Sequence, residues 1–390
     1  MLAPFMSPEP KPWFRLTPAR EAQAATPAGG SEPSRVEVLL MFAMMLALHL
    51  FTVCRAGSFW ELAVSRTDDM DYVEVADIIR HWHFAGGPIS QYFWGFPYVI
   101  AGVSTLLSIP ELMAAVVISV LASLALCMLL HRLYGGWVTA VFLLINFEWI
   151  QLSVEGGSEP LFMCLLFASF LVARSGRWNL AALLASLSTT VRPVGVFALA
   201  CFAIVLARQK RYRHLAVITL IGLALGVLYV IPLWRLFGTP FANFIGYRGD
   251  WGPHGWPLTY PFGALISSFL AELHKARWYS LTLFATWPLL ALVSAVAIWL
   301  PRNRQGFLAR YQPEALFASI YTLFYLSYNN GEIVWLFSRF LIPVLPLLVF
   351  SLRDSIPRDR RLLWAAAVLS ALLSSAGLVH FKNVFGFSPP

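Results

Sequence analysis

Charged residues are scarce in this sequence. Only 12% of its 390 residues are Asp, Glu, Lys or Arg, whereas an ordinary soluble domain contains roughly 25%. Hydrophobic residues make up 58% of the chain, and the mean hydropathy is +0.68. This composition excludes a soluble globular protein and indicates a polytopic, all-α membrane protein whose helices face lipid.

Cysteine is scarce too, and its placement excludes a disulfide framework or a CxxC metal site. Each of the four cysteines, Cys54, Cys127, Cys164 and Cys201, lies inside or at the edge of an apolar run, where cysteine behaves as a small hydrophobic residue. Histidines with His-Glu-x-x-His spacing are also missing, so we assign no metal site from spacing.

Positive charge is in excess, with a net charge of +8 and a pI near 9.5. The Lys and Arg residues form short clusters between apolar runs, which is typical of membrane topology signals, and we therefore expect no nucleic-acid partner. Residues 1–34 are rich in Pro, Ala and Ser without a cleavable signal. We expect them to be a disordered cytoplasmic tail before a single transmembrane domain over residues 35–390.

The apolar runs predict about eleven transmembrane helices. They lie at about 36–54, 94–109, 112–131, 137–150, 158–174, 178–191, 194–208, 214–236, 281–300, 314–328, 334–352 and 361–380. Arginine clusters place alternate connections in the cytoplasm, and the simplest arrangement that satisfies parity makes 94–109 a re-entrant or interfacial element. The long segments 55–93 and 238–280 fall on the outer side, where they can roof a cavity.

The stretch "SRTDDMDYVEVADIIRHW" in the first outer segment places three aspartates, Asp68, Asp69 and Asp71, within four positions. Tyr72 and apolar residues as far as Trp82 then recur at helical spacing, which predicts an amphipathic helix on the membrane surface. Acids ahead of a helix can act as caps, but one cap needs one acid. We therefore interpret Asp68 and Asp69 as candidate catalytic residues.

A second acidic stretch, "SVEGGSEPLF", carries Glu155 and Glu159 on the same predicted side of the membrane. Ser158 followed by Glu159 and a proline also makes an ordinary helix start. Acids at membrane depth are costly enough to be candidates for a functional site. Both interpretations stay open from the residues alone.

Two arginines lie at predicted outer helix ends. Arg192 occurs in "TTVRPVGVF" and Arg339 in "WLFSRFLIPVLPLLVF". Each could extend to the lipid headgroups, or both could bind a phosphate, for which guanidinium groups are well suited. The aromatic outer stretch 245–263 adds Arg248 and His254 and is either an interfacial belt or a surface for a sugar or polyprenyl head.

Four motifs in order give a family resemblance. The acids with Tyr72, followed by "YFWGFPYVIAG", resemble the first outer loop of the GT-C glycosyltransferases, membrane enzymes that use polyprenyl-phosphate sugars. "GGSEPLF" is similar to a stretch of the GPI mannosyltransferase branch, "RPVG" to an Arg-Pro that follows it, and "SRFLIPVLPLL" to a late Arg-x-x-x-Pro-x-x-Pro helix. The family 39-like branch shares this general pattern.

The resemblance implies a GT-C fold and an inverting transfer of a single sugar, with mannose as the first choice. The donor would be a polyprenyl-phosphate sugar such as a dolichyl-phosphate sugar, and the acceptor a glycolipid, glycan or protein on the extracytoplasmic side of a bacterial inner membrane or an ER membrane. Asp69 or Asp68 would be the base, Arg192 and Arg339 would hold the phosphate, and Glu159 would orient the acceptor. Glu155, Tyr72, Arg248 and His254 are the further substrate-binding candidates.

No cofactor is required by this scheme, although it leaves room for a divalent metal between the acids. Two other functions use similar features, namely a transporter or lipid-linked sugar flippase and a non-catalytic subunit of a glycosylation complex. The sequence shows no internal repeat and concentrates its acids in an outer loop, which weighs against a transporter built from inverted repeats.

Overall fold

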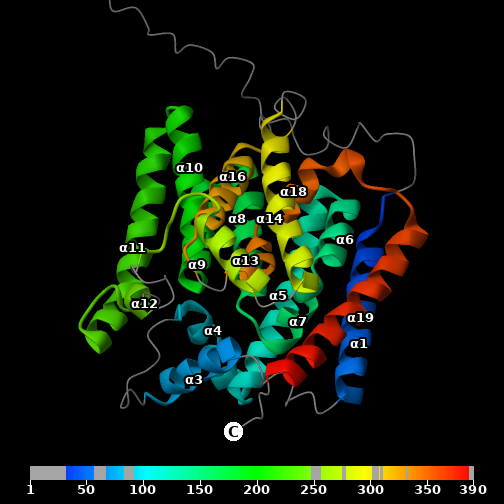
Figure 1. The fold of residues 1–390 in the computed structure, drawn as a ribbon. Coiled ribbons are helices and arrows are strands. Elements are labelled where there is room, and N and C mark those ends of the chain that lie inside the picture. The colour runs from blue at the N-terminus through cyan, green and yellow to red at the C-terminus, as the bar shows by residue number, and fades with distance from the viewer. Residues whose placement is uncertain are drawn as a thin grey trace, which may run out of the picture. The chain divides into compact units, whose positions relative to one another are not determined.

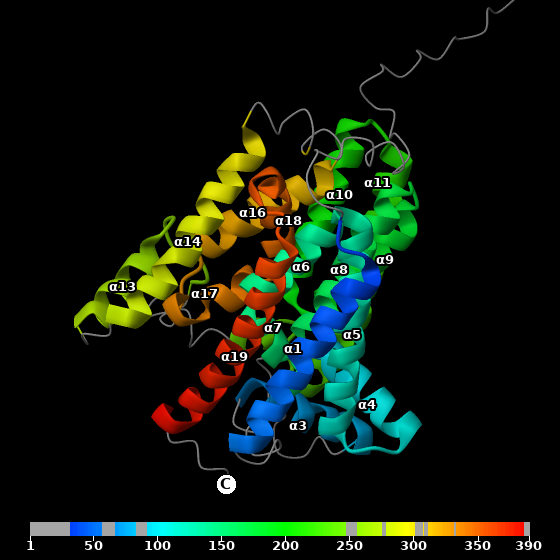
Figure 2. The same ribbon diagram turned by 90° about the vertical axis from the view of Figure 1, so that its right-hand side faces the viewer.

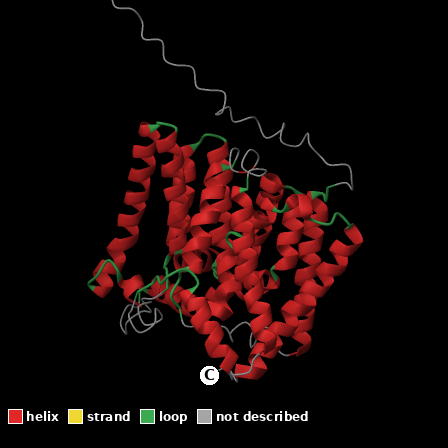
Figure 3. Cartoon of the chain, turned by 45° about the horizontal axis from the view of Figure 1, so that its top comes forward, coloured by secondary structure: helices red, strands yellow, loops and turns green. Residues whose placement is uncertain are grey.

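The computed structural model describes residues 32–56, 67–82, 92–246, 256–274, 278–300, 307, 311–330 and 333–385. For residues 67–69, and for parts of the later helices, it describes the backbone but not the side chains. Within these ranges all secondary-structure elements are helices (Figure 3), and β-structure is limited to an isolated bridge between Leu258 and Tyr328. The all-α prediction is confirmed.

The helices are labelled in Figure 1, and most of their bounds coincide with predicted apolar runs. Their bounds are α1 Arg35–Ala56, α3 Thr67–His81, α4 Gly95–Leu107, α5 Glu111–Tyr134, α6 Gly136–Ile145, α7 Phe147–Glu155, α8 Glu159–Arg174, α9 Trp178–Val191, α10 Val196–Arg208, α11 Tyr212–Phe237, α12 Ala242–Gly246, α13 Gly263–His274, α14 Trp278–Trp299, α16 Gln312–Leu326, α17 Ile333–Leu341, α18 Leu345–Ser351 and α19 Arg360–Phe385. Short 3₁₀ turns, Pro193–Gly195 and Arg353–Ser355, join α9 to α10 and follow α18.

Among the described residues, three helices are long and apolar enough to cross a membrane, namely α1, α5 and α11. The bent pair α6 and α7 raises this number to four if it counts as one span. Shorter apolar helices such as α9 and α4 fall below that length. The chain is therefore an integral membrane protein, while the total of eleven crossings stays a prediction.

Two predicted runs are broken. The run 137–150 divides at Asn146 into α6 and α7, whose axes differ by 84°. The run 334–352 divides into α17 and α18 just ahead of Pro346. Such breaks are tolerated in a membrane protein where the freed backbone is buried in protein or lines a polar site. Each break starts or ends a helix close to the polar cluster described below.

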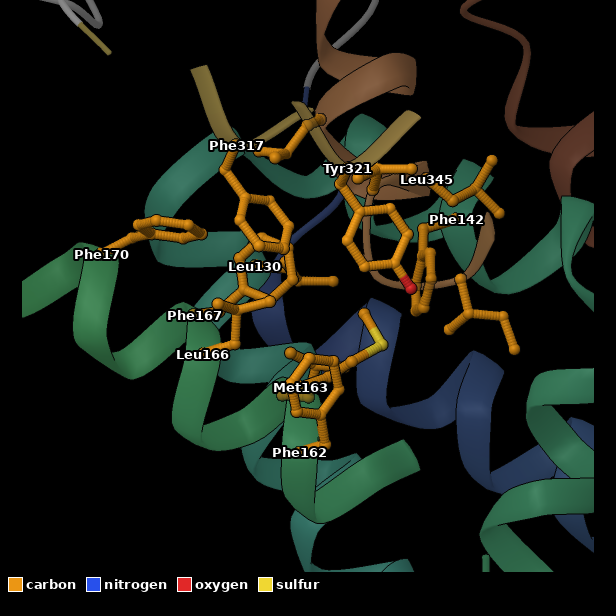
Figure 4. Packing of buried hydrophobic residues seen from close by; sticks show 14 of the residues in the cluster. Leu130, Phe142, Phe162, Met163, Leu166, Phe167, Phe170, Phe317, Tyr321 and Leu345 are labelled. Atoms are coloured by element: carbon orange, nitrogen blue, oxygen red, sulfur yellow. The ribbon is translucent and has the colours of Figure 1, made fainter. Parts of the chain in front are cut away.

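Helix α8 lies at the centre of the core. It packs against α9 and α5, while α1 packs against α19 elsewhere in the bundle (Figure 2). The buried residues Phe162, Leu166, Phe167 and Phe170 of α8 face Leu130 of α5, Phe317 and Tyr321 of α16 and Leu345 of α18 (Figure 4). Because α8 is held on several sides by close-packed rings, the position of its first residue, Glu159, is fixed by the core.

Helix α3 is amphipathic, as predicted, and its buried face packs on α4 and α5. Tyr72, Val75 and Ala76 are buried, whereas Glu74 and Asp77 are exposed. Trp82 lies one residue beyond the end of α3, where its backbone is in the left-handed region (φ 54°), and its side chain is 79% exposed.

The far end of α3 is tied to the turn between α4 and α5. The Arg80 Nη1 donates to Glu111 Oε1 at 2.6 Å and to Ser104 Oγ at 2.7 Å. The Ser104 hydroxyl donates in turn to the carbonyl of Ile109 at 2.6 Å. These partly buried bonds join three helices, so α3 is anchored and not simply laid on the surface.

Candidate active site

The first buried charge of the site is Glu159, which begins α8. Its side chain is fully buried, and Pro160 follows in the first turn, where the missing proline N–H costs no helix hydrogen bond. Ser158 stands at the capping position, yet its side chain makes no capping bond to the helix. The Ser158 hydroxyl is used elsewhere in the site.

Arg192 is placed by the end of α9. The helix stops because Arg192 is extended (φ −141°, ψ 130°), as expected of a residue before proline. Its backbone N–H still donates to the Ser188 carbonyl at 2.9 Å. The turn Pro193–Gly195 then folds back against α9, since a Cβ on Gly195 would lie 2.5 Å from Ser188 Oγ. This close approach holds the Arg192 backbone in place.

Arg339 comes from the last turn of α17, immediately before the break that leads to α18. The neighbouring helix α16 supports this segment through Tyr321, whose hydroxyl donates to the Phe340 carbonyl at 2.8 Å. Tyr325 of the same helix stacks on the Phe340 ring at 4.8 Å. Contacts with α16 thus hold Arg339 beside Glu159, which is 180 positions away along the chain.

The three charged side chains form a buried triad on one carboxylate oxygen. Arg192 Nη2 donates to Glu159 Oε1 at 2.5 Å, and Arg339 Nε donates to the same oxygen. The side chains of Arg192 and Arg339 are only 17% and 13% exposed. We call Arg192, Glu159 and Arg339 the Arg–Glu–Arg triad.

The triad has an excess of positive charge. Two guanidinium groups and one carboxylate leave a net charge of about +1, and the other carboxylate oxygen of Glu159, Oε2, is buried without a hydrogen-bond partner among the described residues. Burying charge is costly unless it is compensated. The arrangement is therefore suited to an incoming anion, for which two fixed guanidinium groups are strong donors.

Tyr72 reaches the triad through Ser158. Arg192 Nε donates to Ser158 Oγ at 3.1 Å, and the Ser158 hydroxyl lies 3.3 Å from the Tyr72 hydroxyl, to which it donates. The Tyr72 ring is held edge-on by Tyr92 and Phe96, with ring centroids 5.2 and 5.5 Å away. Helix α3 is thereby connected to the two arginines.

The structure brings together four of the predicted site residues, Tyr72, Glu159, Arg192 and Arg339. Glu155 is 1% exposed and ends α7, separated from Glu159 by a left-handed turn at Gly156 (φ 87°).

Asp68 and Asp69 lie in the first turn of α3, one residue or two inside it, whereas the sequence pattern placed them ahead of the helix. They stand about one helical turn before Tyr72. Their side chains lie outside the described residues, as do Arg248 and His254, which fall in 247–255.

Two polar residues escaped sequence reasoning. Ser158 was interpreted only as a helix cap. Glu148, in the first turn of α7, accepts a hydrogen bond from Ser338 at 2.8 Å, next to Arg339. The signal for Glu148 was available, because an acid inside an apolar run is itself a candidate site residue. Where residues are described, no group of three His, Cys, Asp or Glu side chains is placed to hold a metal ion.

Comparison with known proteins finds a match by fold but none by family model or curated sequence. No family model matches the sequence, and no curated protein matches it. Among solved structures, the fold is similar to that of ArnT from Cupriavidus metallidurans, which was crystallised with undecaprenyl phosphate bound. The TM-score is 0.51 at 16% identity, over 91% of this chain and 66% of ArnT. The chain has the GT-C fold.

The GT-C fold confirms the architecture that the four motifs implied. The chain spans just under two thirds of the length of ArnT. At 16% identity the likeness concerns the fold, so the chemistry of this chain must be argued from its own residues.

Proposed function

We propose that this protein is a membrane glycosyltransferase that moves a single sugar from a polyprenyl-phosphate donor to an acceptor hydroxyl. The observation that carries the proposal is the buried Arg–Glu–Arg triad, joined through Ser158 to the helix that bears Asp68 and Asp69. It occurs in a chain whose fold is shared with a protein that binds undecaprenyl phosphate.

The roles follow from charge. In a direct displacement, the acceptor oxygen bonds to the anomeric carbon as the bond from that carbon to the phosphate oxygen breaks, which inverts the anomeric configuration. Asp69 or Asp68 takes the proton of the acceptor hydroxyl. Arg192 and Arg339 stabilise the negative charge that develops on the departing phosphate.

Glu159 has a different role in this proposal from the acceptor-orienting one that the resemblance implied. It binds both guanidinium groups through Oε1, and it thereby keeps two like charges close together in a buried place. A preorganised pair of cations needs no reorganisation when the phosphate charge develops. Glu155, Arg248 and His254 remain candidate contacts of the sugar or the acceptor.

The finer assignments rest on the resemblance. We propose mannose as the sugar, a glycolipid, glycan or protein as the acceptor, and the extracytoplasmic side as the place of reaction. The membrane would be a bacterial inner membrane or an ER membrane. A divalent metal at the acids is compatible with the mechanism but is not needed by it.

The test is transfer by purified protein. Protein in detergent is incubated with radiolabelled polyprenyl-phosphate sugars and an acceptor lipid extract, since a flippase gives no transfer once the membrane is dissolved. Asp69→Asn and Asp68→Asn are compared with Asp77→Asn, an exposed acid of the same helix that bonds to His81.

We expect the variant that lacks the base to lose roughly 10²- to 10⁴-fold in transfer rate, while Asp77→Asn keeps the rate of the unmodified protein. Full activity in both Asp69→Asn and Asp68→Asn would show that neither residue is the base. The protein would be a flippase and not an enzyme if the unmodified protein transfers no sugar from any donor and moves a lipid-linked sugar across the membrane of vesicles.

A further inference from the structure

A continuous line of hydrogen bonds connects the triad to α3. It runs from Arg192 Nε to Ser158 Oγ at 3.1 Å and from the Ser158 hydroxyl to the Tyr72 hydroxyl at 3.3 Å. Ser158 is fully buried and Tyr72 is 5% exposed. In such surroundings, breaking a bond leaves a buried polar group without compensation.

The direction of this line is set by chemistry. A guanidinium group can only donate, so Ser158 Oγ must accept from Arg192. The serine proton is then donated to the Tyr72 oxygen. The orientation of Arg192 is thus defined twice, by Glu159 at Nη2 and by Ser158 at Nε.

The Ser158 side chain does not cap helix α8. A serine at this position ordinarily caps the helix, a bond worth about 1 kcal/mol, but the Ser158 side chain makes no capping bond to α8. Its hydroxyl instead joins two residues that lie 86 and 34 positions away along the chain. Local helix stability therefore does not explain why a serine stands at this position.

We propose that Ser158 is a positioning residue that couples the orientation of Arg192 to the docking of α3. The inference rests on the proposed function, in which Arg192 binds the donor phosphate and α3 carries the base. Ser158 and Tyr72 then keep the phosphate-binding group and the base in a fixed relation, so that a donor bound at the triad meets a correctly placed acid.

The experiment compares Ser158→Ala, Tyr72→Phe and the double variant. Binding of undecaprenyl phosphate to purified protein in nanodiscs is one measurement, and the kcat and KM of sugar transfer are the other. Ser169→Ala is the matched control, because Ser169 of α8 is as buried as Ser158, and among the described residues its hydroxyl bonds only locally, to the Leu166 carbonyl at 2.6 Å.

We expect Ser158→Ala to weaken undecaprenyl phosphate binding roughly tenfold or more, the usual effect of losing a bond to a charged group. Tyr72→Phe should lower kcat more than it raises KM, since Arg192 keeps its serine while α3 loses its link. The double variant should resemble Ser158→Ala alone, because both changes break the same line. Ser169→Ala should match the unmodified protein in both measurements.

The coupling would be overturned if the two single variants act independently. In that case their fold-changes in binding and transfer would multiply in the double variant. A Ser158→Ala protein that binds and transfers like Ser169→Ala would also overturn the coupling. If the unmodified protein binds undecaprenyl phosphate but transfers no sugar, the proposed function fails, and the binding series alone still decides whether Ser158 orients Arg192. Failure of the unmodified protein to bind undecaprenyl phosphate overturns both ideas.

Discussion

Helix α4 meets α9 backbone to backbone at Gly95, immediately before the segment that carries Arg192. A Cβ at Gly95 would lie 2.4 Å from the carbonyl carbon and 2.5 Å from the carbonyl oxygen of Thr190. Carbon atoms pack well at roughly 3.5–4.0 Å, so Gly95→Ala must move one helix by about 1 Å. Because the obstacle is backbone, no side-chain rotation can relieve it.

Gly102 supplies the control within the same helix, since a Cβ there would meet no described residue within 4 Å. Replacing glycine by alanine favours a helix by about 0.5–1 kcal/mol, and this gain applies to both positions. Overpacking costs about 1–3 kcal/mol and applies to Gly95 alone. The free energy of unfolding should therefore be about 1–3 kcal/mol lower for Gly95→Ala than for Gly102→Ala.

Unfolding in mixed detergent micelles with added SDS measures the difference in stability, and sugar transfer measures the effect on the site. A displacement of 1 Å near reacting groups can cost about 10²-fold in rate, so Gly95→Ala should transfer far more slowly than Gly102→Ala. Equal stability and equal transfer by the two variants would refute the close contact between α4 and α9 and the role we give it.

Three further variants test the buried charges. Glu159→Gln leaves two buried guanidinium groups without their anion and should lower the free energy of unfolding by about 3–5 kcal/mol; stability unchanged in SDS titration would contradict the triad. Glu314→Gln should cost a similar amount, since buried Glu314 accepts from Arg174 Nε at 2.7 Å at the other end of α8. Arg80→Gln should lower the free energy of unfolding by about 1 kcal/mol. The charge-swapped variant Arg80→Glu with Glu111→Arg should recover part of this loss. If thermal unfolding shows no recovery, the ion pair does not anchor α3.

Sequence reasoning found the helices because their signal is local. An apolar run long enough to bury its own backbone in lipid has little choice but to be helical, and the bounds of α1, α5, α8 and α11 agree closely with the runs. The breaks were not found. The division at Asn146 has no proline at that point, and it depends on how α6 and α7 pack against other helices.

Candidate site residues were predicted where charge contradicts the apolar surroundings. Glu159, Arg192 and Arg339 are conspicuous because each ionised side chain at membrane depth is costly. The same rule applied to Glu148, which was overlooked, and no rule of composition marks Ser158, whose hydroxyl looks like an ordinary helix cap. The contacts of Ser158 depend on its neighbours in the fold and not on its residue type.

The sequence by itself determined that this is a helical membrane protein, which of its charges are out of place, and which family it resembles, because hydropathy and helix periodicity are properties of neighbouring residues. Only the tertiary structure decided that Arg192 and Arg339, 33 and 180 positions from Glu159, share one of its carboxylate oxygens. That contact depends on the packing of α8, α9 and α17, and packing between distant segments leaves no periodic mark on the chain.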